Sequence, residues 1–206
     1  MSQSEFWNQR YALPEYAYGK EPNVFIQQQL DLLTPGKILF PAEGEGRNAI
    51  YAAVKGWEVT AFDISREAQK KALQLATQQH VSIEYLVGTL DELALESPRF
   101  DAIGLCFAHM PAEHRTAWHQ GLVNLLKPGG VLILQGFSKS HAAYQQLNPK
   151  AGGPKELTML FSKQELQLDF ESLQIDILQE EIRLLQEGAY HQGESALINL
   201  VAHKPH

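Results

Sequence analysis

The segment from residue 37 to residue 63 constrains the fold of this 206-residue chain more than any other feature. It predicts a strand, a glycine turn, a helix and a second strand that ends in a carboxylate, in the order Ile38–Phe40, Gly44–Gly46, Arg47–Lys55 and Trp57–Phe62, with Asp63 next. An α/β sheet builds nucleoside sites from this unit, at the carboxyl ends of its parallel strands. We therefore expect an α/β fold with a nucleoside site at this turn.

The same alternation of strand and helix continues along the chain. Further strands are predicted at Val81–Val87, Phe100–Phe107 and Val131–Phe137, and helices at Val24–Leu33, Ser65–Gln78, Pro111–Leu126, His141–Leu147 and Lys163–Phe170. The nearly unbroken apolar run over residues 100–107 is typical of a central parallel strand that is covered on both faces.

Two long extended runs, Leu173–Leu185 and Ser195–His203, end the chain, and a hairpin-like connection joins them. The predicted fold is a Rossmann-like three-layer sandwich whose mostly parallel seven-stranded sheet ends in a C-terminal antiparallel hairpin. We expect a single domain over residues 1–206, in which residues 1–35 form an N-terminal lid and helix and residues 36–206 form the α/β core.

The composition limits the classes of function. The net charge is −7 and no Lys/Arg cluster is visible, so binding to nucleic acid is not expected. The N-terminal residues are polar and no apolar stretch approaches about 18 residues, so we expect neither a signal peptide nor a membrane span. The single cysteine, Cys106, excludes an intramolecular disulfide and fits a reducing, cytoplasmic location. We expect a small-molecule substrate and no metal; the oligomeric state is left open by the sequence.

Two cofactors compete for the predicted nucleoside site. Gly44-Glu-Gly-Arg-Asn-Ala49, with Asp63 about 20 residues on, satisfies the fingerprint of a nicotinamide dinucleotide. Glu43 and Glu45 would repel its pyrophosphate, however, unless both side chains point away. S-adenosylmethionine has no phosphate, and its sulfonium and ammonium groups tolerate nearby carboxylates. The C-terminal hairpin also differs from the parallel sixth strand of a plain dinucleotide-binding domain, so we favour S-adenosylmethionine.

Short segments spread over nearly the whole chain resemble one family. They are Phe6-Trp-Asn-Gln-Arg-Tyr11, Tyr18-Gly-Lys-Glu-Pro-Asn23, Ala42-Glu-Gly-Glu-Gly-Arg-Asn48, Phe62-Asp63, Phe100-Asp101, His109-Met-Pro111, Leu126-Lys-Pro-Gly-Gly130, Gly152-Gly-Pro154 and Tyr190-His-Gln-Gly193. In this order they resemble class I S-adenosylmethionine-dependent methyltransferases, close to the tellurite-resistance and thiopurine methyltransferase branch. The resemblance implies S-adenosylmethionine as methyl donor, S-adenosylhomocysteine as product, and a small soft acceptor such as a thiol or a metalloid oxyanion.

Three positions depart from the pattern of that family. The family usually has an acidic residue at the position of Phe40 and glycine at the position of Ala42. The missing acid removes one partner near the methionine end of the cofactor, and Glu43 is the candidate substitute. Thr89 stands where the family often has Asp near the adenine amino group, and its hydroxyl would take that role.

The resemblance and the turn together give the expected cofactor-binding residues. Gly44 and Gly46 would let the backbone approach the cofactor, and Asp63 would grip the ribose hydroxyls. The alternatives are an ordinary turn and a cap for the helix at Ser65. Aromatic residues of the N-terminal segment would form a lid over the sulfonium, or simply pack on the sheet. The full expected set is Trp7, Tyr11, Tyr18, Ala42, Glu43, Gly44, Gly46, Asn48, Asp63, Ile64, Thr89, Leu90 and Phe107.

Two histidines are the candidate catalytic residues. His109 lies at the carboxyl end of a predicted central strand, where a group with an ordinary pKa near 6.5 would accept a proton from the acceptor. The alternative is a histidine whose ring is satisfied by neighbouring backbone. His191 lies in the hairpin connection and would reach the substrate, unless that connection is a solvated loop. Cys106 is expected to be a buried, inert thiol.

The expected reaction needs little catalytic machinery. Methyl transfer from a sulfonium is an in-line displacement, and a soft nucleophile needs little or no general base. Two alternatives stay open at this point. One is a protein that binds S-adenosylmethionine without catalysis, and the other is an NAD(P)-dependent oxidoreductase, for which no Tyr/Lys or His/Asp catalytic set is found in the sequence.

Overall fold

The structure is a computed structural model that describes residues 1–95 and 97–206. One seven-stranded sheet runs through it in the order β3-β2-β1-β4-β5-β7-β6. The strands are β1 Lys37–Pro41, β2 Glu58–Asp63, β3 Glu84–Val87, β4 Phe100–Cys106, β5 Leu126–Phe137, β6 Gln174–Glu187 and β7 His191–His203. Strands β1 to β5 pair in parallel, and β7 lies antiparallel between β5 and β6. The predicted sheet and its antiparallel end are thereby confirmed.

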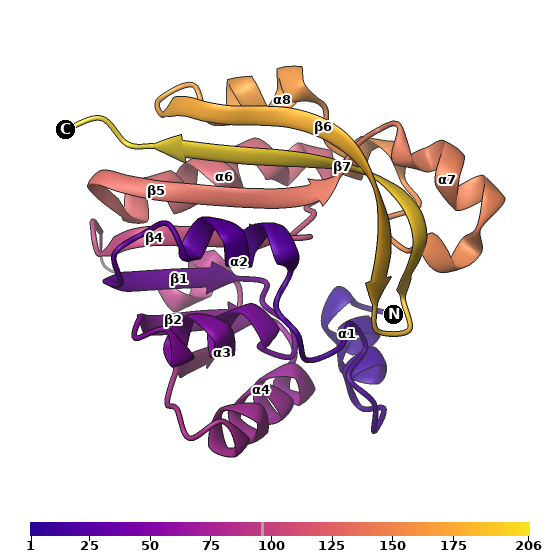
Figure 1. Cartoon of the computed structure of the whole chain (residues 1–206), viewed down its shortest axis with the longest axis horizontal. Helices are drawn as coiled ribbons and strands as arrows, with labels where there is room; N and C mark the ends of the chain where they lie inside the picture. Colours follow the sequence, from indigo (N-terminus) through magenta and orange to yellow (C-terminus); the bar gives the residue numbers. More distant parts are fainter. Residues whose placement is uncertain (96) are drawn as a thin grey trace.

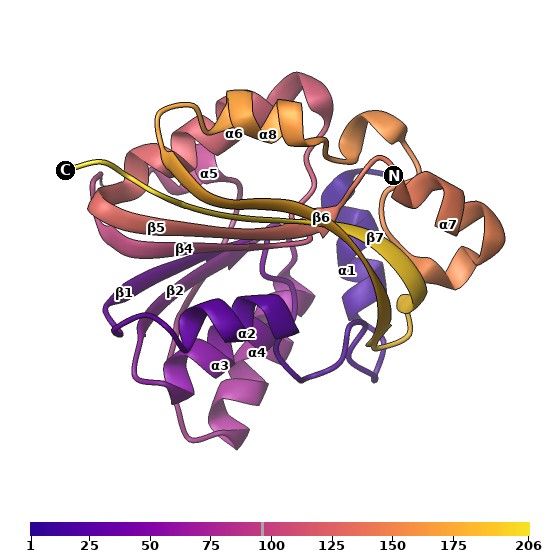
Figure 2. The same ribbon diagram turned by 45° about the horizontal axis from the view of Figure 1, so that its top comes forward.

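Helices cover both faces of the sheet (Figure 1). They are α1 Gln3–Tyr11, α2 Val24–Leu30, α3 Arg47–Val54, α4 Arg66–Gln78, α5 Leu90–Leu93, α6 Ala112–Leu125, α7 His141–Leu147 and α8 Lys163–Asp169, with 3-10 turns at Pro149–Ala151 and Leu157–Met159. Figure 2 shows the three layers: α2, α3 and α4 lie on one face, α6 and α8 on the other, and α1 and α7 lie beyond the carboxyl ends of the strands. Over the described ranges, no helix combines the length and apolar character that crossing a membrane requires.

The alternation of β1 explains the family departure at position 40. Ile38 and Phe40 pack into the core on the α2 and α3 face, whereas Leu39 packs into the core on the opposite face. The ring of Phe40 lies directly over Gly104 of β4, where any side chain would collide with it. Phe40 is fully buried, so it fills the core, and an acid at this position would lie in apolar surroundings.

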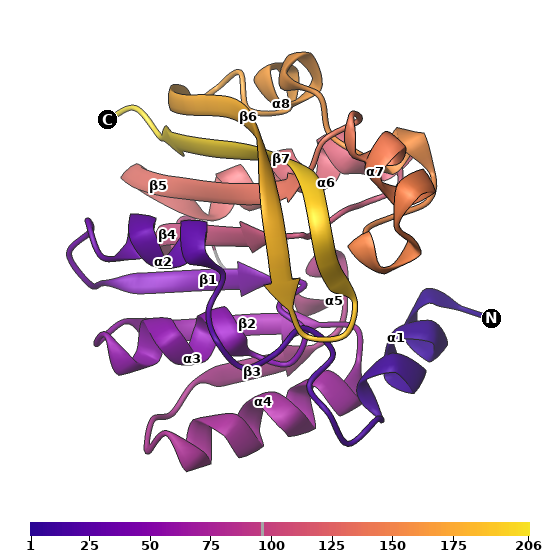
Figure 3. The same ribbon diagram turned by 45° about the vertical axis from the view of Figure 1, so that its right-hand side comes forward.

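The C-terminal hairpin extends well past the rest of the sheet. β6 and β7 pair from Gln174 with His203 to Glu187 with His191, whereas β5 pairs with β7 only from Leu197 onward. The free part of the hairpin bends over the carboxyl ends of the strands toward the N-terminal segment (Figures 1 and 3). At its tip, the N–H of Ala189 donates to the carbonyl of Ala17 over 2.9 Å. The hairpin strands are thus longer than predicted, and their tip approaches the predicted site.

Two local features differ from the sequence prediction. The aromatic N-terminal segment contains α1, which was not predicted; Ser2 and Glu5 start it with a reciprocal capping box. The Lys127–Gly130 segment, which lies before the strand predicted at Val131–Phe137, is part of β5, because that strand begins at Leu126.

Candidate functional site

The glycine turn and Asp63 are in direct contact at the carboxyl ends of β1 and β2. The N–H of Gly44 donates to Asp63 Oδ2 over 3.0 Å, and the N–H of Ser65 donates to Oδ1 over 2.9 Å. Gly44 and Gly46 have φ values of 64° and 90°, which favour glycine. Burial raises the pKa of the Asp63 carboxyl to about 6. The structure therefore brings together the turn and the acid that the spacing predicted, while Ser65 itself caps α4.

Ala42 stands where the family that the sequence resembles usually has glycine. Its φ is 50°, in the left-handed region. That conformation costs an L-residue about 1–2 kcal/mol relative to the right-handed one. The alanine therefore adds local backbone strain beside the site.

The two glutamates of the turn are bound by the protein itself. The Glu43 carboxylate accepts the backbone N–H groups of Asn48 and Ala49, in the first turn of α3, each over 2.8 Å. Glu45 pairs with Lys71 over 2.7 Å. Asn48 uses its carbonyl oxygen to accept the N–H of Asn23 over 2.9 Å. These contacts correct two expectations: the carboxylates have partners other than a ligand, so they do not argue against a pyrophosphate, and Glu43 does not replace the missing acid.

Helix α1 lies over the turn. The hydroxyl of Tyr11 is 2.8 Å from the point that a Cβ on Gly44 would occupy. Trp7 stacks on Tyr11 with ring centroids 5.4 Å apart. Asn8 Oδ1 accepts the hydroxyl of Ser65 over 2.8 Å and so holds α1 on the end of β2. The segment thus packs on the glycine turn, and its role as a lid over a cofactor stays a prediction.

The residues expected around adenine have other contacts. The hydroxyl of Thr89 forms a capping box with Glu92 at the start of α5, so the role expected for it would compete with that cap. Leu90 packs beside Gly121 of α6. Ile64 stays close to the glycine turn, and its carbonyl accepts a serine hydroxyl of α1 over 3.1 Å.

An aromatic cluster lies at the carboxyl end of β4, formed by Tyr18, Phe107, Phe137, Tyr190 and His191. The His191 ring lies 4.5 Å from both Tyr18 and Phe107, and the Phe107 and Phe137 rings lie 4.6 Å apart. Tyr18 also contacts Tyr190 at 6.0 Å. Phe107 follows β4 directly and has a φ of 52°, which is strained for an aromatic residue. The structure thus brings together Tyr18, Phe107 and His191, which the sequence analysis had selected separately.

His109 is not placed as a general base. Its Nδ1 lies 2.8 Å from the carbonyl of Met159, and its Nε2 accepts the N–H of Phe137 over 3.1 Å. The ring stacks on Phe161 at 4.3 Å, and burial lowers its pKa to about 3. Both nitrogens are therefore used by backbone groups, which corrects the catalytic expectation. Burial also raises the pKa of the Cys106 thiol to about 12, as expected of an inert cysteine.

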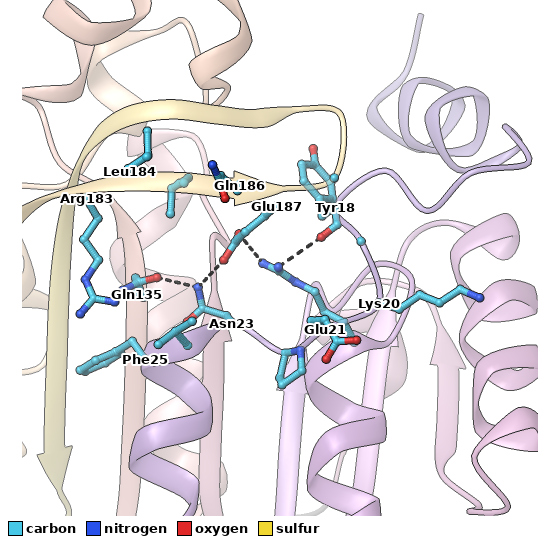
Figure 4. Close-up of a pocket in the computed structure, with 16 residues that line it drawn as sticks. Tyr18, Lys20, Glu21, Asn23, Phe25, Gln135, Arg183, Leu184, Gln186 and Glu187 are labelled. Carbon is cyan, nitrogen blue, oxygen red and sulfur yellow. Dashed lines mark hydrogen bonds and ion pairs between the residues drawn. The ribbon is translucent and has the colours of Figure 1, made fainter.

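A charged group behind the aromatic cluster was missed by the sequence analysis. The Glu187 carboxylate accepts Arg47 Nη2 over 2.8 Å, Asn23 Nδ2 over 3.1 Å and His191 Nδ1 over 3.3 Å. Figure 4 shows Asn23 between Glu187 and Gln135, beside a pocket of about 300 Å³. We call Arg47, Glu187 and His191 the edge cluster. Arg47 and His191 lie within quoted family segments, whereas Glu187 lies three residues before one, and no local pattern marked their pairing.

Comparisons with known proteins agree with this geometry. Residues 38–130, which hold the glycine turn and Asp63, match the family model described as a methyltransferase domain. The chain is 32% identical over 123 residues to a ubiquinone biosynthesis O-methyltransferase of Alkalilimnicola ehrlichii, and 34% identical over 92 residues to one of Xanthomonas campestris. These matches cover 58% and 43% of this chain but 49% and 38% of the relatives, so the chain spans about half or less of their length.

Solved structures share the fold at low identity. A protein described with the conversion of a disulfide bond into a thioacetal group during echinomycin biosynthesis has a TM-score of 0.79 and 18% identity, over 99% of this chain and 93% of that one. A methyltransferase from Anabaena variabilis gives 0.71 and 17%, over 98% and 93%. TehB from Haemophilus influenzae gives 0.70 and 14%, over 98% and 66%.

Within the described residues, no group of three or more His, Cys, Asp or Glu side chains is arranged to hold a metal ion.

The glycine turn, the buried acid and the family match all fall in one segment. Residues 38–130 thus match a methyltransferase domain and lie within the Rossmann-like fold that the sequence predicted.

Proposed function

We propose that the whole protein is an S-adenosylmethionine-dependent methyltransferase that acts on a small acceptor at the aromatic cluster. The contact between Gly44 and Asp63 supports this proposal, because it is the contact expected of a nucleoside site and lies inside the segment that matches a methyltransferase domain. The aromatic cluster lies at the end of the neighbouring strand β4, beside that site. The other expected cofactor contacts, Trp7 and Tyr11 above all, form part of the same proposal.

The residues around Gly44 fit this cofactor. Each oxygen of Asp63 accepts one backbone N–H and keeps further lone pairs for the hydroxyl groups of a ribose. The stacked rings of Trp7 and Tyr11 offer π faces that attract a cation. A side chain at Gly44 would collide with Tyr11, so glycine allows α1 to pack directly on the turn.

The chemistry asked of the protein is chiefly alignment. When bound, S-adenosylmethionine supplies an electrophilic methyl group on a cationic sulfur. The rings of Tyr18, Phe107 and Phe137 would hold an acceptor against this group and exclude water, which is the main protein contribution to an in-line transfer.

Two classes of acceptor compete. The soft acceptor expected from the resemblance, a thiol or a metalloid oxyanion, would need no base, and the tellurite-resistance and thiopurine branch stays part of that proposal. A hydroxyl acceptor is favoured by His191 in the aromatic cluster, and it matches the O-methyltransferase names of the curated relatives. We favour the hydroxyl.

The first experiment is calorimetric titration of the protein with S-adenosylhomocysteine, and with NAD in parallel. We expect micromolar binding of S-adenosylhomocysteine and none of NAD. Asp63→Ala should weaken binding about 30-fold, because loss of hydrogen bonds to a charged group costs about 2 kcal/mol. Asp176→Ala, which removes a half-exposed carboxylate at the far end of the hairpin, is the matched control and should bind normally.

Binding of NAD alone would contradict the proposal and restore the dinucleotide alternative. Binding of S-adenosylhomocysteine without methyl transfer to any thiol or hydroxyl probe would favour a non-catalytic cofactor-binding protein.

A further inference from the structure

The Glu187 carboxylate is held from three sides. Arg47 of α3 and Asn23, just before α2, donate to it from the sheet side, and His191 donates from the paired strand β7. The side chain of Glu187 is 14% exposed and that of Arg47 is 8% exposed. Although burial raises the pKa of Glu187, the hydrogen bond from His191 and the charge of Arg47 outweigh it and bring that pKa to about 2. Glu187 is therefore ionised at neutral pH.

An ionised Glu187 fixes the tautomer of His191. A carboxylate can only accept, so Nδ1 of the imidazole must carry the proton that lies between them. The other ring nitrogen, Nε2, then presents a lone pair. Among the described residues, no hydrogen-bond donor engages that Nε2, whereas Nε2 of His109 is taken by a backbone N–H.

The ring of His191 lies where an acceptor would be methylated under the proposed function. It contacts Tyr18 and Phe107, and it meets Phe137 edge-on at 5.1 Å. Gly152 lies against the same ring, because a Cβ there would come within 2.6 Å of Cδ2 of His191. The side chain of His191 is 5% exposed, so the base is oriented by Glu187 and enclosed by the aromatic cluster.

We propose that His191 is the general base of the reaction, that Glu187 and Arg47 are its positioning residues, and that the acceptor is therefore a hydroxyl compound such as a phenol. The inference rests on the proposed function. As the acceptor oxygen bonds to the methyl carbon, its proton passes to Nε2, and the electron pair of the broken S–CH₃ bond stays on sulfur as a neutral thioether. The positive charge moves from sulfur to the imidazolium, beside the Glu187 carboxylate, and solvent later removes the proton.

The choice of a hydroxyl follows from the need for a base. A thiolate or a metalloid oxyanion already carries its charge at neutral pH and gains nothing from proton removal. A phenol ionises near pH 10, so a base in contact with it speeds transfer about 10²–10⁴-fold. An ordinary thiol, with a pKa near 8.5, is about a tenth ionised at pH 7.5 and gains less from a base, so an oriented imidazole at the aromatic cluster favours the hydroxyl acceptor.

The kinetic test compares two probes with S-adenosylmethionine as donor: catechol, and 4-nitrothiophenol, which is already a thiolate at pH 7.5. His191→Gln should lower kcat for catechol about 100-fold while changing kcat for the thiolate less than about threefold. Glu187→Gln should give the same pattern with a smaller loss. His203→Gln, at the half-exposed pair with Asp176, is the matched control and should change neither rate.

Equal losses on both probes, or a wild-type enzyme that methylates the thiolate but not catechol, would overturn the inference. A second measurement does not depend on turnover: long-range ¹⁵N–¹H spectra should show His191 in the Nδ1–H form, and Glu187→Gln should disturb that form. An Nε2–H tautomer in the wild type would overturn the inference as well. Failure of the proposed function appears separately, as absent S-adenosylhomocysteine binding in the calorimeter.

Discussion

Two regions of the molecule contain the same three groups in different settings. Between α6 and α8, Asp169 Oδ2 accepts Arg115 Nε over 2.9 Å and His119 Nδ1 over 2.8 Å; we call these three residues the closed cluster. His119 is fully buried there, and its Nε2 has no hydrogen-bond partner among the described residues. The edge cluster has the same carboxylate, imidazole and guanidinium, but it lies at the carboxyl ends of the strands behind the aromatic cluster.

The difference indicates that the three residue types alone do not decide what a group of carboxylate, imidazole and guanidinium does; its place in the fold matters as well. Arg115 and His119 are one helical turn apart on α6, so the closed cluster joins two neighbouring helices. Arg47 and Glu187 are far apart in sequence, and α3, β6 and β7 supply the edge cluster. We expect the closed cluster to contribute to stability and the edge cluster to turnover.

The largest expected effect is on stability. Asp169→Ala should lower the free energy of unfolding by about 3–5 kcal/mol, because it leaves a buried histidine without a counter-charge and a buried arginine with only Glu165, at 3.4 Å. Urea unfolding measures the loss, and Asp176→Ala, from a half-exposed pair with His203, should cost less than about 1 kcal/mol. A loss below about 1 kcal/mol for Asp169→Ala would remove the proposed distinction between the clusters.

An intermediate effect is expected in acid. The pKa of Asp169 is about 2: burial raises it, but the hydrogen bonds from His119 and Thr116 prevail. Glu187 also has a pKa of about 2. Each ionised carboxylate contributes roughly 2 kcal/mol to the free energy of unfolding. This contribution is fully present above the pKa values of the unfolded chain, near 4, and is lost as the pH falls through about 2.

Between pH 5 and pH 2, the free energy of unfolding should thus fall less steeply with decreasing pH in Asp169→Asn and in Glu187→Gln than in the wild type. An unchanged slope in both variants would show that neither carboxylate is held by its cationic neighbours.

The smallest effect concerns backbone strain, which distinguishes the surroundings of the edge cluster from the segment that holds the closed cluster. Ala42 and Phe107 have left-handed φ values there, whereas no non-glycine residue from 112 to 169, all of them described, does. Ala42→Gly should raise the free energy of unfolding by about 0.5–1 kcal/mol, since relief of strain outweighs the greater freedom of the unfolded glycine. A destabilised variant, seen as a lower thermal midpoint, would contradict this assignment of strain.

The fold could be predicted because its signals are local. Apolar runs of strand length, helical spacing and turn residues predicted the central sheet and its antiparallel end. Helix α1 was missed because its buried face is small: only Tyr11 of its residues is buried, so no apolar stripe marks it. The start of β5 was missed because Lys127–Gly130 looks like a turn in isolation.

The site was predictable only where one segment holds both partners. The spacing from Gly44 to Asp63 predicted their contact, which the structure contains. The bonds of Glu187 to Arg47 and His191 depend on how the hairpin folds back, and no local pattern encodes that. His109 was misjudged for the same reason, since the carbonyl of Met159 that binds its ring comes from a distant loop.

The hydrogen bond between Ala189 and Ala17 links the hairpin tip to the N-terminal segment that carries α1. Gly188 packs so closely on Ala17 and Gly19 that a side chain there would collide with both. Any displacement of that segment that uncovers Gly44 therefore also pulls on the strand that holds His191. Under the proposed function we therefore expect exchange of the spent donor and departure of the methylated product to be coupled, because both depend on this one contact.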